Sequence, residues 1–138
     1  MPITKNSTRI NEFVADTMAI VLHLEKRKSG TNVKQILTDA ENGNAVVHVP
    51  AIVFAEILYL SEKKRIVLTL SDVENQLSKF PNFRSQELSF EIVKIAETIT
   101  DIPELHDRLI AATAKHLGLE LITNDPKIQN SAFVKTVW

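Results

Sequence analysis

The segment FVADTMAIVL, residues 13–22, carries a single charge, Asp16, between two apolar runs. Residues 13–15 have the character of a short buried strand, and residues 18–24 continue in a helix-like pattern, so we expect a strand that leads into a helix at Asp16. A second unit of this kind follows at residues 46–49, where β-branched residues precede Pro50 and an apolar helix over residues 51–64. Strands that lead directly into helices are typical of an α/β fold.

The alternation of strands and helices continues to the end of the chain. We expect further helices over residues 32–41, 72–79, 90–98 and 104–117, and further strands over residues 85–88, 119–123 and 133–138. Ser71 with Glu74 fits a capping box for one of these helices, and Gly118 fits a C-terminal cap for another. Strands separated by helices imply right-handed crossovers. The fold prediction is therefore α/β, a three-layer sandwich with a central, mainly parallel sheet flanked by helices.

Composition bounds the size and class of the protein. A chain of 138 residues suits one domain, residues 1–138, with the polar residues 1–12 as a mobile N-terminal arm. The 16 Lys and Arg nearly balance the 17 Asp and Glu, which argues against a broad electrostatic grip on duplex nucleic acid. Without Cys, disulfides, thiolate zinc sites and Cys nucleophiles are excluded. No apolar run reaches the roughly 18–20 residues of a membrane helix, so we expect a cytoplasmic protein without a membrane segment.

Four carboxylates stand in or beside apolar runs, unlike the other acids of the chain. Asp16 and Glu56 are each the only charge in an apolar stretch, Asp107 begins the run DRLIAATA, and Asp125 closely follows the strand LELIT. A buried carboxylate is costly unless a cation, hydrogen-bond donors or a metal ion compensates its charge. Asp16 and Asp125 come at the carboxyl ends of expected strands, where open α/β sheets place their ligand crevices. Four oxygen ligands without a Cys or a His pair favour Mg²⁺ or Mn²⁺.

Each of these acids also has a structural interpretation. Asp16 is suited to cap the helix that follows it, and Glu56 to pair with Lys63 or another cation. The helix dipole favours an acid such as Asp107 in the first turn of a helix. Asp125 precedes a proline, a position typical of a turn residue. Since all four lie near the same predicted edge of the sheet, a shared site is the stronger interpretation.

The four acids and their neighbours resemble the PIN-domain family, metal-dependent nucleases that include the VapC toxins of bacterial toxin–antitoxin pairs. The matching pieces are VADT at residues 14–17, AEIL at residues 55–58, HDRLIAATA at residues 106–114 and LITND at residues 121–125. The resemblance extends from Phe13 to the C-terminus. It implies a compact PIN-like α/β fold with a parallel sheet, and an acidic Mg²⁺ or Mn²⁺ site that hydrolyses RNA.

The resemblance also assigns roles to particular residues. The acids that it implies to be catalytic and metal-binding are Asp16, Glu56, Asp107 and Asp125. Thr123 would support this cluster, and Thr17 would add a contact beside Asp16. The implied partners are an RNA substrate and a small antitoxin protein. This chain departs from many members of the family at Met18, where they have a small polar residue, and in its N-terminal arm.

Basic residues near the expected site are candidates for contacts with RNA phosphates. Lys63, Lys64 and Arg65 form one basic run at a helix end, residues 26–28 form another, and Arg108 adjoins the third acid. Cations that favour the C-terminal end of a helix dipole explain both runs equally well. The four His residues show no ligand spacing, and only His106 directly adjoins one of the four singled-out acids, Asp107, where it could act as a supporting neighbour.

Three other functions would place different demands on these residues. A stand-alone RNA-processing nuclease needs the same acids, whereas a catalytically silent binding module of the same fold would not need all four. A haloacid-type phosphotransferase would need an Asp-x-Asp pair, and residues 16–18 lack the second acid. The apolar residues of the helix at residues 52–60 predict a homodimer.

Overall fold

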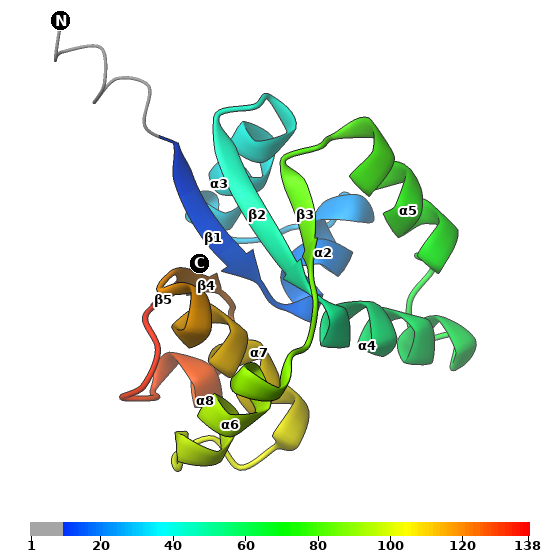
Figure 1. The fold of residues 1–138 in the computed structure, drawn as a ribbon. Helices are drawn as coiled ribbons and strands as arrows, with labels where there is room; N and C mark the ends of the chain where they lie inside the picture. Colours follow the sequence, from blue (N-terminus) through cyan, green and yellow to red (C-terminus); the bar gives the residue numbers. More distant parts are fainter. Residues whose placement is uncertain (1–9) are drawn as a thin grey trace, which may run out of the picture.

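The computed structural model describes residues 10–138 and shows a five-stranded sheet flanked by helices (Figure 1). The elements in chain order are β1 (Asn11–Ala15), α2 (Thr17–Leu24), α3 (Thr31–Glu41), β2 (Ala45–Pro50), α4 (Ala51–Glu62), α5 (Leu70–Lys79), β3 (Phe83–Gln86), α6 (Phe90–Thr98), α7 (Leu105–Leu117), β4 (Glu120–Ile122), α8 (Pro126–Gln129) and β5 (Thr136–Val137). The prediction of an α/β fold with a central sheet is confirmed.

The sheet is parallel throughout, with the strand order β3-β2-β1-β4-β5. The central strand β1 pairs with β2 on one side and β4 on the other, so that Phe13 lies between Val47 and Glu120. From β1 the chain crosses first to β2 and then to β3 on one side of the sheet. It then returns to β4 and β5 on the other side of β1. The strand order therefore reverses at β1, and open α/β sheets hold their ligands at such a switch point, beyond the carboxyl ends of the strands.

The core explains why the sheet is parallel. In β1 the side chains of Val14 and Ala15 are fully buried, and β2 is buried along most of its length. Strands buried on both faces need helices on both sides, which crossovers between parallel strands supply. Helix α7 contributes six consecutive buried residues, 109–114, and three of them are alanines that let it approach β1 and β4 closely.

Several element boundaries match the sequence prediction. Helix α6 runs over the predicted residues 90–98, and α7 ends at Gly118, whose φ of +69° is the left-handed conformation that glycine adopts without strain. Helix α4 begins after Pro50 and is closely followed by the basic run at residues 63–65. No helix within residues 10–138 is long and apolar enough to span a membrane.

Other boundaries differ. The capping box predicted at Ser71 and Glu74 is wrong, because Thr69 and Asp72 form that box and α5 begins at Leu70. The hydroxyl of Thr69 accepts a hydrogen bond from the backbone N–H of Asp72, so Thr69 rather than Ser71 is the N-cap of α5. Strand β1 begins at residue 11 rather than 13, and β3 spans residues 83–86 rather than 85–88. Residues 1–9 of the expected N-terminal arm lie outside the described residues.

Candidate functional site

The four acids singled out by sequence line one cavity. It has a volume of about 460 Å³ and lies where β1 and β4 end, between the first turns of α2, α7 and α8 and one side of α4. The residues around it are Asp16, Thr17, Met18, Glu56, Leu60, Asp107, Ile110, Asn124, Asp125 and Pro126. Carboxylates from four separate segments of the chain therefore converge, as the position of the strand ends predicts. We call this space the acidic cavity.

Two of the acids cap helices at the edge of the sheet. Asp16 is the N-cap of α2, and its Oδ1 accepts a hydrogen bond of 2.9 Å from the backbone N–H of Ala19. Asp125 caps α8 in the same way, with its Oδ1 accepting 2.9 Å from the N–H of Lys127. The hydroxyl of Thr123 accepts a bond of 3.1 Å from the N–H of Asp125. Asp16 therefore both caps α2 and lines the acidic cavity.

The other two acids project from helices. Glu56 lies on α4, and its Oε1 accepts a hydrogen bond from the hydroxyl of Thr17 on α2. The ion pair that sequence suggested between Glu56 and Lys63 does not form, because the Lys63 ammonium lies 5.7 Å from the ring centroid of Tyr59. Asp107 stands in the first turn of α7, where Glu104 is the capping residue. Both helices thus bring a carboxylate to the cavity.

Burial makes the charge of Asp16 unfavourable. Its side chain is only 6% exposed, and this burial is the main cause that raises the pKa of Asp16 from 3.8 to about 6. Hydrogen bonds from Thr123 and from the Ala19 N–H lower this pKa, while the negative charges of Asp125 and Glu56 raise it. The hydroxyl of Thr123 therefore favours the ionised form of Asp16.

Asp107 has a raised pKa for similar reasons. Its pKa is also about 6, raised first by burial and then by the charges of Asp125, Glu104 and Glu56. Lys127 lowers it, but no Lys, Arg or His within residues 10–138 forms an ion pair with any acid of the cavity. Crowded carboxylates without a protein cation leave a negative site whose charge a bound cation would neutralise.

The donor set fits a hard divalent cation. Carboxylate oxygens, with the side-chain amide of Asn124 beside them, are the ligands that Mg²⁺ and Mn²⁺ prefer. Among the described residues, however, no three Asp, Glu or His side chains already stand as a compact ligand group. Glu56 is turned toward the hydroxyl of Thr17. Holding an ion would therefore require some of these side chains to rotate toward one another.

The predicted phosphate contacts are not part of the acidic cavity. Lys63 and Arg65 lie by the ring of Tyr59, and Lys64 stands just beyond the end of α4 with a φ of +57°. Arg108 points its Nε into the protein, where this atom is buried without a hydrogen-bond partner among the described residues. None of these side chains lines the cavity.

Sequence reasoning missed two residues beside the acids. Asn124 lines the acidic cavity, and its place between Thr123 and Asp125 at a strand end was the available signal. Tyr59 lines an adjoining hollow together with His106. His106, expected beside Asp107, instead bonds Glu104 through Nδ1 at 2.8 Å.

Comparison with known proteins finds a matching family profile and solved structures of similar fold. The sequence profile of the PIN domain matches residues 13–134. No curated protein sequence is significantly similar to the chain. Among solved structures, VapBC2 from Rickettsia felis bound to a promoter DNA fragment matches with a TM-score of 0.71 and 19% identity, over 92% of this chain and 98% of that one.

Two further structures show the same likeness. FitAcB from Neisseria gonorrhoeae has a TM-score of 0.65 and 23% identity, over 91% of this chain and 96% of that one. VapC20 from Mycobacterium tuberculosis, a toxin that cleaves the sarcin–ricin loop, has a TM-score of 0.63 and 14% identity, over 89% and 97%. At these identities the likeness establishes a shared fold.

Proposed function

This chain belongs to the PIN domain family, and on that premise we propose that it is a Mg²⁺- or Mn²⁺-dependent endoribonuclease, the toxin of a VapBC-like toxin–antitoxin pair. The observation that carries the proposal is the acidic cavity, in which four carboxylates meet without an ion pair to a cation among residues 10–138. Structural neighbours named as VapBC and VapC proteins support the toxin assignment.

The reaction is the hydrolysis of an RNA phosphodiester bond. A divalent cation held by Asp16, Glu56, Asp107 and Asp125 would supply Lewis acidity for the attacking water and the leaving oxygen. The chain itself positions these acids: Thr17 holds Oε1 of Glu56, and Thr123 holds the backbone of Asp125. In the metal-free protein the pKa of Asp107 is about 6, so its carboxylate is still mostly ionised at pH 7 and available to a cation.

Metal binding should raise the thermal stability of the protein. A cation that binds only the folded state stabilises it by mass action, and it also relieves the repulsion among the carboxylates. We expect the melting temperature to rise by several degrees with millimolar Mn²⁺, and the rise to shrink in Asp107→Asn. The measurement is a thermal melt with and without Mn²⁺, and with Glu62→Gln, outside the cavity, as the control. An equal response in wild type and Asp107→Asn would contradict the ligand assignment.

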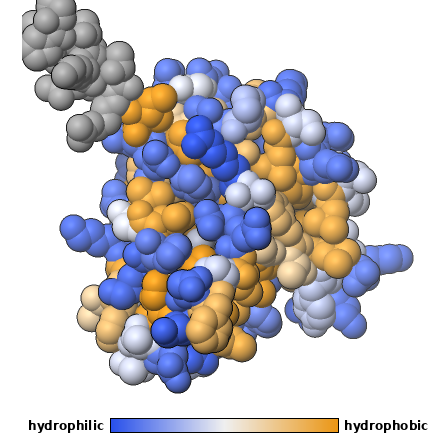
Figure 2. Space-filling view, in the orientation of Figure 1, coloured by the Kyte–Doolittle hydropathy of each residue, from blue (hydrophilic) through white to orange (hydrophobic). Residues whose placement is uncertain are grey.

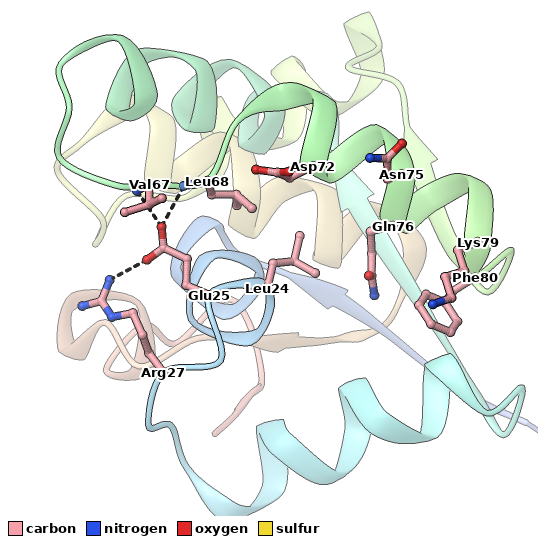
Figure 3. Close-up of a pocket in the computed structure, with 10 residues that line it drawn as sticks. All are labelled: Leu24, Glu25, Arg27, Val67, Leu68, Asp72, Asn75, Gln76, Lys79 and Phe80. Carbon is pink, nitrogen blue, oxygen red and sulfur yellow. Dashed lines mark hydrogen bonds and ion pairs between the residues drawn. The ribbon is translucent and has the colours of Figure 1, made fainter.

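A groove away from the acids suits a protein partner. It has a volume of about 670 Å³ and lies between the end of α2, the α4–α5 loop and one side of α5 (Figure 3). Leu24, Val67 and Phe80 give it apolar walls, and Glu25 and Lys79 add opposite charges. We propose that an antitoxin segment occupies this groove. The eight residues of α2 span about 12 Å, so a partner chain that continues along α2 reaches the acidic cavity, where a basic side chain would neutralise the acids.

Hydrogen bonds to Glu25 hold one border of the groove together. Oε2 of Glu25 accepts hydrogen bonds of 2.7 and 2.9 Å from the N–H groups of Val67 and Leu68, and Arg27 donates to Oε1 at 3.2 Å (Figure 3). These bonds lower the pKa of Glu25 against the effect of its burial, so the carboxylate stays charged and holds the loop to α2. The side chain of Val67 is left 87% exposed at the groove, which makes it the natural position to probe.

Expression of the protein alone should inhibit growth, and co-expression with an antitoxin, sought as a small protein encoded next to this chain, should relieve the inhibition. We expect Val67→Glu to remain toxic in the presence of that partner, because a charge at the groove border opposes docking of an apolar segment. Phe90→Glu, at another exposed apolar side chain, is the matched control and should still be neutralised. Growth assays and pull-downs measure both effects. Absence of toxicity and of any captured partner would favour a stand-alone nuclease.

The homodimer remains a prediction. Within residues 52–60, Leu58 and Tyr59 are 41% and 50% exposed, so α4 does present apolar surface. On the face drawn in Figure 2, apolar side chains interrupt the polar surface in several patches and form no single continuous face.

A further inference from the structure

A second hollow opens directly beside the acidic cavity and shares two residues with it, Glu56 and Leu60. Its volume is about 430 Å³, within the range of about 300–1,000 Å³ that small-molecule sites occupy. The residues around it are Ile52, Ala55, Glu56, Tyr59, Leu60 and His106. Most of them project from one face of α4, because positions 52, 55, 56 and 59 follow the spacing of neighbours on a helix surface. The acids thus border an apolar recess.

An exposed aromatic ring with two cations forms one wall of this hollow. Tyr59 is 50% exposed, the Nζ of Lys63 lies 5.7 Å from its ring centroid, and the Cζ of Arg65 lies 6.0 Å from it. Proteins that hold single-stranded nucleic acid combine these two features, since bases stack on aromatic rings and cations attract the phosphate backbone. Without a bound cation the acids repel phosphates, so the ring and the two cations beside it supply contacts to RNA that do not depend on the metal ion.

We propose that this hollow binds the base of a nucleotide next to the phosphodiester bond that is cut, in a single-stranded RNA. The assignment rests on the proposed ribonuclease function. The apolar faces of the base would contact Ile52, Leu60 and the ring of Tyr59. Its polar edge would meet His106, whose Nδ1 is taken by Glu104 and whose Nε2 is therefore the ring nitrogen left for a base. The phosphate beyond that base would approach Lys63 and Arg65.

The test measures binding of short RNA to a variant that cuts it too slowly to interfere with the measurement. Fluorescence anisotropy is recorded in Mg²⁺ for Asp107→Asn with an eight-nucleotide RNA, and with the same RNA carrying one abasic residue at each position in turn. We expect one position beside the cleavage site to lose affinity on the order of tenfold, the scale of one stacked base. Adding Tyr59→Ala should cause a similar loss with the intact RNA and remove the effect of the abasic residue at that position.

Two further variants make the result specific. Tyr59→Phe keeps the ring and should bind as tightly as the parent protein. Phe90→Ala is the matched control, because Phe90 is 72% exposed and has Lys94 at 5.7 Å from its ring centroid, but lies outside both the hollow and the acidic cavity. It should leave RNA affinity unchanged.

Three results would overturn the assignment. If wild type cleaves RNA while neither an abasic residue nor Tyr59→Ala changes affinity, the hollow is not a base site, although the ribonuclease function stands. If Tyr59→Ala halves the molecular mass measured by light scattering, the hollow is instead covered by a second copy of the chain. If wild type neither binds nor cleaves RNA, the proposed function fails and the base site with it.

Discussion

Asp16→Asn should greatly slow RNA cleavage and, at the same time, make the metal-free protein more stable. The loss of activity should be at least about a hundredfold, the scale on which a positioned catalytic group acts. The gain in stability follows from burial: ionised Asp16 is unfavourable in the folded state, with a pKa raised from 3.8 to about 6. A shift of this size corresponds to up to about 3 kcal/mol at neutral pH. Asparagine is an equally good N-cap, so the bond from Ala19 is retained.

The pH dependence of stability isolates the contribution of Asp16. A carboxyl whose pKa is higher in the folded than in the unfolded state takes up a proton on folding, so its penalty is present above about pH 6 and disappears as the pH falls toward 3.8. The stability difference between Asp16→Asn and wild type should therefore shrink over that window. Urea unfolding curves from pH 4 to 8 measure it, with Asp39→Asn on α3 as the control. A destabilised Asp16→Asn protein at pH 7 would contradict this account.

Glu56→Gln should reduce cleavage by at least about a hundredfold and leave the stability nearly unchanged or slightly raised. Gln presents the same oxygen to the hydroxyl of Thr17, so the contact between α2 and α4 is kept. Removing the charge relieves Asp16 and Asp107, whose pKa values Glu56 raises. The measurements are an unfolding curve and an RNA cleavage time course. Glu62→Gln on the same helix, outside the acidic cavity, is the matched control.

A structural function for Glu56 predicts the opposite pattern. If Glu56 were half of a buried ion pair, its replacement would leave a cation uncompensated and cost several kcal/mol. No such partner is found among residues 10–138, since Lys63 lies by the ring of Tyr59 instead. A Glu56→Gln protein that is destabilised but fully active would show that the residue is not part of the site.

The convergence of the acids could be predicted because it follows from general rules of parallel sheets. Asp16 and Asp125 directly or closely follow β1 and β4, and the carboxyl ends of neighbouring parallel strands share one edge. Helix boundaries that a single residue determines could also be predicted, as at Pro50 before α4 and Gly118 after α7. In each case the signal lies within a few residues of the feature that it predicts.

Two kinds of feature could not be predicted: the choice of a side chain between two possible partners, and contacts between residues far apart in the sequence. Lys63 is four residues after Tyr59 but seven after Glu56, so the neighbour one helical turn away is the closer partner. The bond between Thr17 and Glu56 joins two helices whose relative position no local pattern encodes. The hollow beside Tyr59 likewise exists only because α4 and the start of α7 lie together.

Single-turnover cleavage of RNA tests the central claim most directly. Purified protein is incubated in excess over labelled RNA with Mg²⁺, with Mn²⁺, or with EDTA, and Asp107→Asn is run beside wild type in each condition. We expect wild type to cleave with either cation, to be inactive in EDTA, and to recover when the cation is restored in excess. Asp107→Asn should cleave at least about a hundredfold more slowly. Cleavage that persists in EDTA, or that Asp107→Asn carries out at the wild-type rate, would contradict this claim.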